Sequence, residues 1–80
     1  MNAYKIVYGE KDDMHEMYKL NFSDAKSLYF RYKKQYKALK DKTSYTEERY
    51  LEGILKDYWS FSVVVKNYEY VVKISPIEID

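Results

Sequence analysis

The chain has 80 residues, no cysteine and a formal net charge of +1. This length limits it to one small domain, residues 1–80, and the absence of thiols excludes a disulfide framework and a thiolate zinc site. A charge so close to zero argues against a general affinity for nucleic acid or acidic surfaces. Aromatic residues make up 19% of the sequence and include 11 tyrosines, so we expect tyrosine to wall much of the core.

The sequence is that expected of a cytoplasmic protein. No apolar run approaches the roughly 20 residues needed to span a bilayer. Residues 1–10 also lack the basic start and apolar segment of a secretion signal. If a phage encodes the protein, the compartment is the host cytoplasm.

The first predicted elements are two β-strands. Alternating residues from Tyr4 to Tyr8 indicate a half-buried strand that stops at Gly9, and a second alternation runs from Met14 to Phe22. The polar cluster between them is typical of a turn. We therefore expect an N-terminal antiparallel hairpin.

A helix is predicted next, from about Asp24 to Lys40. Ser23 precedes it as the candidate cap, because a short polar side chain accepts hydrogen bonds from the free amides of a first helical turn. Lysines near the end of the segment complement the negative end of the helix dipole. At 100° per residue, the apolar residues that share one side of this helix are Ala25, Leu28, Tyr29, Tyr32, Tyr36 and Leu39.

A second helix is predicted after Ser44. Ser44 and Glu47 have the spacing of a capping box, in which each side chain satisfies a free amide of the other residue. Apolar residues then follow at helical intervals, although Gly53 weakens such a helix by roughly 1 kcal/mol relative to alanine. The apolar set is Tyr50, Leu51, Ile54 and Leu55.

The strongest strand signal lies in residues 58–75, which are rich in β-branched and aromatic side chains. A two-residue loop at Lys66 and Asn67 gives one clean apolar face, whereas a three-residue loop would place Glu69 and Lys73 opposite apolar residues. Asn67 tolerates the positive φ of such a tight turn, and Pro76 is expected to end the second strand. The predicted pairs are Trp59 with Ile74, Phe61 with Val72, Val63 with Tyr70 and Val65 with Tyr68.

The element order is therefore ββααββ. It predicts an α+β domain in which a four-stranded antiparallel sheet carries two helices packed on one face.

Phe30 is the residue that the helical pattern does not explain. It lies about 140° from Ala25, away from the tyrosines and among lysines. It either packs on the second helix or a loop, stands as a lone surface aromatic, or anchors a partner. In the last case the binding residues are Lys26, Phe30, Arg31, Lys33, Lys34 and Lys37.

Two partners suit an aromatic residue in a basic rim, namely an acidic protein surface and single-stranded nucleic acid. From Lys26 to Lys42 there are seven basic residues and one acid, Asp41, so five or six lysines are available for phosphates. Arginine, the better reader of bases, occurs only twice, and no RNA-binding signature is present. The sequence therefore favours a protein partner.

No catalytic, metal or cofactor site is predicted. His15 is the only histidine and is expected to be a solvated turn residue. Neighbouring acids, as at Asp12 and Asp13 or Glu47 and Glu48, diverge in a turn or helix and do not share a proton. The two glycines cannot form a phosphate-binding loop. We therefore expect a protein that is not an enzyme.

The C-terminal hairpin offers a different contact. If one of its strands lies at a sheet edge, its free backbone groups can extend the sheet of a partner or of a second copy, which would give a homodimer. Outer-face contacts would then come from Tyr58, Val64 and Val71, which otherwise are scattered surface residues.

Residues with A/T-rich codons number 37, those with G/C-rich codons number eight, and lysine outnumbers arginine 12 to two. Together with the small cysteine-free domain, this profile resembles the small accessory proteins of phages and mobile elements of low-GC bacteria, including anti-CRISPR inhibitors of host defence. The resemblance implies stoichiometric binding that blocks a larger protein or ribonucleoprotein. The alternatives are a small RNA or single-stranded DNA binding protein and a structural homo-oligomer.

Overall fold

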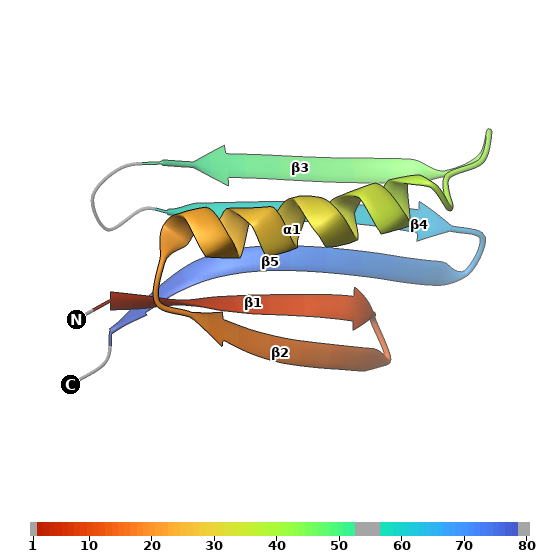
Figure 1. Cartoon of the computed structure of the whole chain (residues 1–80). Helices are drawn as coiled ribbons and strands as arrows, with labels where there is room; N and C mark the ends of the chain where they lie inside the picture. The colour runs from red at the N-terminus through yellow and green to blue at the C-terminus, as the bar shows by residue number, and fades with distance from the viewer. Residues whose placement is uncertain (1, 53–56, 79–80) are drawn as a thin grey trace.

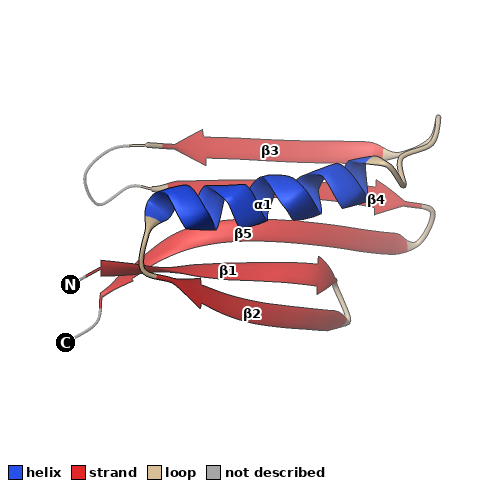
Figure 2. Cartoon of the chain, in the orientation of Figure 1, coloured by secondary structure: helices blue, strands red, loops and turns tan. Residues whose placement is uncertain are grey.

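A computed structural model describes residues 2–52 and 57–78, and within them the chain forms one helix and a five-stranded antiparallel sheet (Figures 1 and 2). The strand order is β2-β1-β5-β4-β3. The α+β class is confirmed, but the predicted four-stranded sheet with two helices is wrong. The elements are β1 (Asn2–Glu10), β2 (Asp13–Lys19), α1 (Phe22–Lys37), β3 (Tyr45–Leu51), β4 (Tyr58–Val65) and β5 (Tyr68–Glu78).

The second predicted helix is instead the edge strand β3. It pairs antiparallel with β4 from Tyr45 opposite Val64 to Leu51 opposite Tyr58. In β3 the backbone groups of this segment bond to β4 instead of to one another within a helix, and its two tyrosines and one threonine suit a strand. Ile54, Leu55 and Gly53, which belonged to the helix prediction, lie outside the described residues.

Ser44 does not cap a helix because its hydroxyl belongs to the turn before β3. Its Oγ accepts a hydrogen bond from the Asp41 amide at 2.9 Å and donates one to Asp41 Oδ1 at 3.0 Å. Asp41 Oδ1 also accepts hydrogen bonds from the amide and hydroxyl of Thr43, both at 2.9 Å. These bonds, led by the Thr43 amide, hold the pKa of Asp41 below its usual value. The Ser44 hydroxyl therefore forms the hydrogen bonds of this turn instead of those of the predicted capping box.

The N-terminal hairpin is confirmed. Strands β1 and β2 pair antiparallel from Tyr4 opposite Lys19 to Glu10 opposite Asp13. Gly9 does not stop the strand but lies within it at a φ of 136°, where a Cβ would collide with the backbone oxygen of Asp13. Its role is to let the two strands approach closely beside the turn.

Helix α1 begins two residues earlier than predicted. Asn21 is the cap, because its side chain accepts a hydrogen bond from the Ser23 amide at 2.7 Å. The helix ends at Lys37, before the predicted end at Lys40. Leu39 therefore lies beyond the helix and is exposed, not part of the core.

The register of the C-terminal hairpin is confirmed for all four predicted pairs, from Trp59 opposite Ile74 to Val65 opposite Tyr68. The positive φ of the turn falls on Lys66, at 58°, and not on Asn67. Pro76 does not end the strand, which continues to Glu78 and places Pro76 opposite Tyr4 of β1. The ladder with β4 has already ended at Ile74, and proline is tolerated where a strand has a neighbour on one side only.

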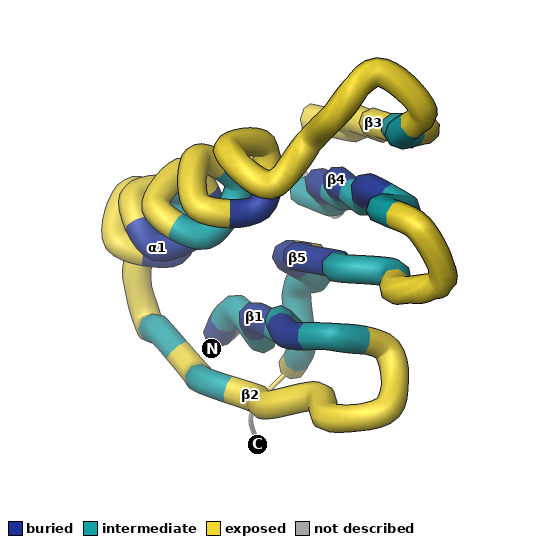
Figure 3. Tube along the Cα trace, turned by 90° about the vertical axis from the view of Figure 1, so that its right-hand side faces the viewer, coloured by how far each residue is buried: buried dark blue, intermediate teal, exposed yellow. Residues whose placement is uncertain are grey.

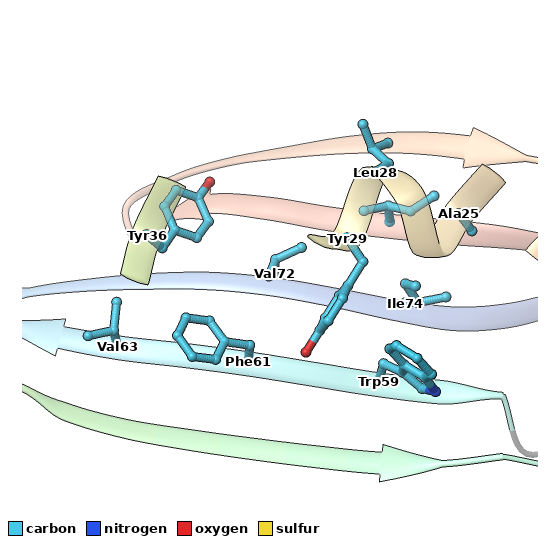
Figure 4. Close-up of a cluster of buried hydrophobic side chains, with 10 residues drawn as sticks. Ala25, Leu28, Tyr29, Tyr36, Trp59, Phe61, Val63, Val72 and Ile74 are labelled. Atoms are coloured by element: carbon cyan, nitrogen blue, oxygen red, sulfur yellow. The ribbon is translucent and has the colours of Figure 1, made fainter. Parts of the chain in front are cut away.

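The core lies between α1 and one face of the sheet (Figures 3 and 4). Tyr29 is fully buried and Tyr36 nearly so, while four further tyrosines pack partly buried against them, which confirms the tyrosine-walled core. No described element covers the opposite face of the sheet (Figure 3). Within residues 2–52 and 57–78, no helix has the length and hydrophobicity needed to cross a membrane. The core residues are Ile6, Ala25, Leu28, Tyr29, Tyr36, Trp59, Phe61, Val63, Val72 and Ile74.

Candidate functional site

Phe30 lies on the helix at the boundary between core and solvent. Its side chain is 47% exposed, yet one side of the ring packs edge-on against Trp59 at 5.3 Å between centroids and against Tyr29 at 5.5 Å. The ring is therefore neither enclosed by the chain nor free in solvent. It is an exposed aromatic surface that the core holds in place.

Trp59 of β4 is the centre of the aromatic cluster that supports Phe30. Its indole is 7% exposed and lies below α1 in Figure 4. The rings of Phe22, Tyr29, Phe30 and Tyr50 surround it in edge-to-face contacts, with centroid separations from 4.9 to 6.0 Å. Such pairs add to the stability that burial alone supplies, so this end of the core is rigidly packed.

Lys26 lies on the same aromatic cluster and is partly buried. Its ammonium is 4.8 Å from the ring centroid of Phe22 and 5.4 Å from that of Trp59, within the range of a cation–π interaction. The charge is therefore held against Phe22 and Trp59, and the Lys26 side chain is less exposed than the sequence implied.

Lys33 joins the helix to the edge strand. Its ammonium lies 2.9 Å from a Glu48 carboxylate oxygen and donates a hydrogen bond to the Tyr50 hydroxyl at 2.6 Å, and that hydroxyl donates to Glu48 at 2.9 Å. Burial lowers the pKa of Lys33, but the bonds to Tyr50 and Glu48 outweigh it and leave the pKa raised. The hydrogen bond from Lys33 in turn lowers the pKa of Glu48 against the effect of burial. Lys33 thus has a structural partner and is not a free cation of the surface.

Lys34 and Lys37 are the exposed cations next to Phe30. Together with Phe30, Lys33 and Ala38 they line an open hollow of about 440 Å³, which we call the basic hollow. Arg31 is exposed but lines a different hollow of about 270 Å³, with residues of β2 and the first half of α1. The fold therefore brings four of the six predicted binding residues together, keeps Lys26 on the neighbouring cluster and places Arg31 elsewhere.

The predicted sheet-edge contacts lie away from an edge. Both β4 and β5 are interior strands, so the edges of the sheet are β2 and β3. Tyr58, Val64 and Val71 point to the uncovered face of the sheet, as expected. None of them lies on an edge strand. A hollow of about 220 Å³ there is lined by Glu47, Arg49, Tyr58, Ser60, Ser62, Glu69, Val71 and Lys73.

The titratable residues that the sequence singled out are dispersed. His15 is on strand β2, not in the turn, with its ring 3.7 Å from Asp13 and tilted over Tyr8. Glu47 and Glu48 point to opposite faces of β3. In the described part of the chain, no group of three or more His, Cys, Asp or Glu residues is placed to hold a metal ion.

Glu48, Tyr50 and Trp59 are the supporting residues that sequence reasoning missed. The reading of residues 44–55 as a helix placed Tyr50 in a core, whereas in β3 its hydroxyl meets Lys33 across the gap to α1. Residues 45–51 show no alternation of apolar and polar residues, because Tyr45 and Tyr50 fall on opposite faces of the strand, so periodicity gave no signal for β3.

Comparison of the chain with protein-family models, curated proteins and solved structures finds no match. Its function is therefore inferred from the side chains and their geometry.

Proposed function

We propose that the protein is a non-catalytic binding module that docks an acidic surface of a larger protein or ribonucleoprotein on its basic hollow. The observation that carries this proposal is the ring of Phe30, which is half exposed and fixed against Trp59, beside the exposed ammonium groups of Lys34 and Lys37. A host defence nuclease is the kind of target that the sequence profile suggests.

The arrangement has the chemistry of an interface anchor. An aromatic side chain that is already ordered loses little conformational entropy on binding, so more of its contact energy contributes to affinity. Cations at the rim attract an acidic partner and align it, and they affect the association rate more than the final affinity. Phe30 and Lys34 therefore have different expected roles, as the anchor and the steering charge.

A protein partner is supported over nucleic acid by the number of available cations. Affinity for nucleic acid grows with each phosphate that is neutralised. Lys33 is already paired with Glu48, and Arg31 lines another hollow, which leaves Lys34 and Lys37 as the exposed cations of the basic hollow. Two exposed lysines and one aromatic ring suit a compact acidic patch better than an extended phosphate backbone.

Such a module acts by occupancy. Without a catalytic step, it inhibits or recruits its target in a one-to-one ratio, as the resemblance to phage and mobile-element accessory proteins implies. The relevant measurement is therefore binding to a saturable number of sites.

The test is affinity purification of binding partners from a lysate of a low-GC bacterium with the wild-type protein and two variants, Phe30→Ala and Lys34→Glu. We expect Phe30→Ala to recover the specific partner at least about tenfold less well, as loss of a hot-spot residue would predict, and Lys34→Glu to recover less of it because the reversed charge repels an acidic partner. Leu39→Ala is the matched control, because Leu39 is 46% exposed and does not line the basic hollow. Lys42→Glu serves in the same way for the charge reversal.

Equal recovery of every partner by wild type, Phe30→Ala and Lys34→Glu would contradict the proposal. An electrophoretic shift assay with single-stranded RNA and DNA tests the alternative. A complex that forms at about 50 mM salt and disappears by about 200 mM would favour a nucleic-acid partner instead.

A further inference from the structure

Strand β3 forms an edge of the sheet with exposed apolar side chains. It is bonded to β4 on one side, and no described element lies on its other side (Figure 1). Tyr45, Tyr50 and Leu51 are 61%, 44% and 55% exposed. The strand contains no lysine or proline, which commonly protect an edge from pairing, although three of its seven residues, Glu47, Glu48 and Arg49, are charged. Its seven residues are thus an available pairing surface.

We infer that β3 pairs antiparallel with β3 of a second copy of this chain, with Glu48 on the two-fold axis. Directly opposite residues of a sheet share a face, and faces alternate along a strand. In a symmetric antiparallel pair, one residue must therefore lie directly opposite the same residue of the second copy, with the axis between them. With the axis at Glu48, Glu47 lies opposite the partner's Arg49 and Tyr45 lies opposite the partner's Leu51.

This register is the one in which the sequence of β3 is complementary to itself. On the uncovered face it forms two Glu–Arg pairs in the middle and two apolar pairs at the ends, and on the other face it sets Thr46 opposite the partner's Tyr50. An axis at Glu47 would place Tyr45 opposite the partner's Arg49 and lose both kinds of pair. An axis at Arg49 would bring two arginines together.

The two Glu48 carboxylates at the axis have their charges compensated within each copy. Like charges directly opposite each other destabilise a strand pair. Each Glu48, however, is 2.9 Å from its own Lys33 and accepts a hydrogen bond from its own Tyr50. The axis therefore carries two carboxylates and two ammonium groups, with no net charge.

The other edge strand, β2, is less suited than β3 to pairing with a second copy. A pair of β2 strands centred on Glu16 would set Asp13 opposite the partner's Lys19, but β2 exposes two large apolar residues where β3 exposes three. Tyr18 is one of these, and its hydroxyl donates to Glu16 at 3.0 Å within the same strand. The β3 edge is therefore the one to test first.

Pairing through β3 places both helices on the same side of one continuous sheet. The two-fold axis of an antiparallel edge pair is normal to the sheet. Rotation about that axis does not exchange the two faces of the sheet, so both helices lie on the same face. The two basic hollows would then flank the β3 strands on one side. The dimer goes beyond the proposed binding function and does not rest on it.

The first experiment is a charge exchange followed by light scattering and sedimentation at protein concentrations up to about 1 mM. Glu47→Arg or Arg49→Glu alone replaces both attractive pairs with repulsive ones, and we expect dimerisation to weaken at least about tenfold. The double variant Glu47→Arg with Arg49→Glu restores opposite charges in the same register, so its dimer should return to within a few-fold of wild type. Circular dichroism of each variant checks that the monomer is folded.

The second experiment reads the register directly, using the absence of native cysteine. Opposed residues in an antiparallel pair have Cα atoms about 4.5 to 5.5 Å apart, which suits a disulfide. Glu48→Cys should therefore cross-link two chains on mild oxidation, while Thr46→Cys, displaced from its symmetry mate by roughly 13 Å along the strand, should not.

A wild-type protein that remains a monomer of 9.8 kDa throughout this range would overturn the inference. A dimer that survives Glu47→Arg but is lost in Lys19→Glu would also overturn it and assign the contact to β2. Equal cross-linking by Glu48→Cys and Thr46→Cys would exclude the proposed register.

Discussion

Lys33 of α1 and Glu48 of β3 form a 2.9 Å ion pair that joins the helix to the edge strand. The lysine side chain is only 16% exposed, and the Tyr50 hydroxyl bonds to both partners. The edge strand is thus tied to the rest of the molecule by its ladder with β4 and by this polar contact. The contact also shields the axis of the proposed dimer from repulsion.

Replacing Lys33 with methionine should lower the free energy of unfolding by about 1–2 kcal/mol, because the change leaves Glu48 and Tyr50 without their charged donor. Chemical denaturation followed by circular dichroism measures this difference. Lys34→Met is the control, since Lys34 is exposed, and its effect should stay within about 0.5 kcal/mol. Equal losses from the two variants would show that the ion pair does not stabilise the fold.

The same pair should make stability depend on pH in the acid range. The pKa of Glu48 is lowered in the folded protein, so its contribution is fully present above the unfolded value near 4.5 and is lost as the pH falls through the folded value. Denaturation curves between pH 7 and pH 3 should show a smaller loss for Glu48→Gln than for wild type. Parallel pH profiles of the two proteins would contradict this assignment.

Phe30→Ala should uncover Trp59, the only tryptophan, without unfolding the domain. The native indole is buried, so its fluorescence should be blue-shifted, and loss of the Phe30 ring should shift the emission towards longer wavelength. We expect a destabilisation of about 1–2 kcal/mol, less than for a fully buried phenylalanine, because half of the ring is already in water. Leu39→Ala should leave the emission unchanged.

Gly9→Ala should destabilise the N-terminal hairpin by about 2–4 kcal/mol. The φ of 136° is disfavoured for any residue with a Cβ, and the added methyl group would meet the backbone of Asp13 across the turn. Thermal unfolding of the variant measures the loss. Glu10→Ala, at the next position in the same strand, serves as the control and should cost under about 1 kcal/mol.

Local chemistry in the sequence was sufficient to predict both hairpins. In the segment around Lys66 and Asn67, a two-residue loop keeps Glu69 and Lys73 off the apolar face and a three-residue loop does not, so the pairing of Trp59 with Ile74 could be predicted from the pattern. The segment around Ser44 carries a capping box that favours a helix, whereas its two tyrosines and one threonine at residues 45–50 also suit a strand. Only the free edge of β4 decided between them, because a strand can pair there and a second helix would leave that edge open.

The same division holds for the candidate site. The helical period by itself determined that Phe30 points away from the centre of the apolar side of the helix and is partly exposed, because the angle between side chains on a helix depends only on their spacing. The tertiary structure alone decided that Trp59 supports this ring, that Lys33 is paired with Glu48 and that Arg31 faces another hollow. Each of these contacts joins residues at least 15 positions apart in the chain or depends on which strand lies beside the helix, and such neighbours follow from the packing of whole elements.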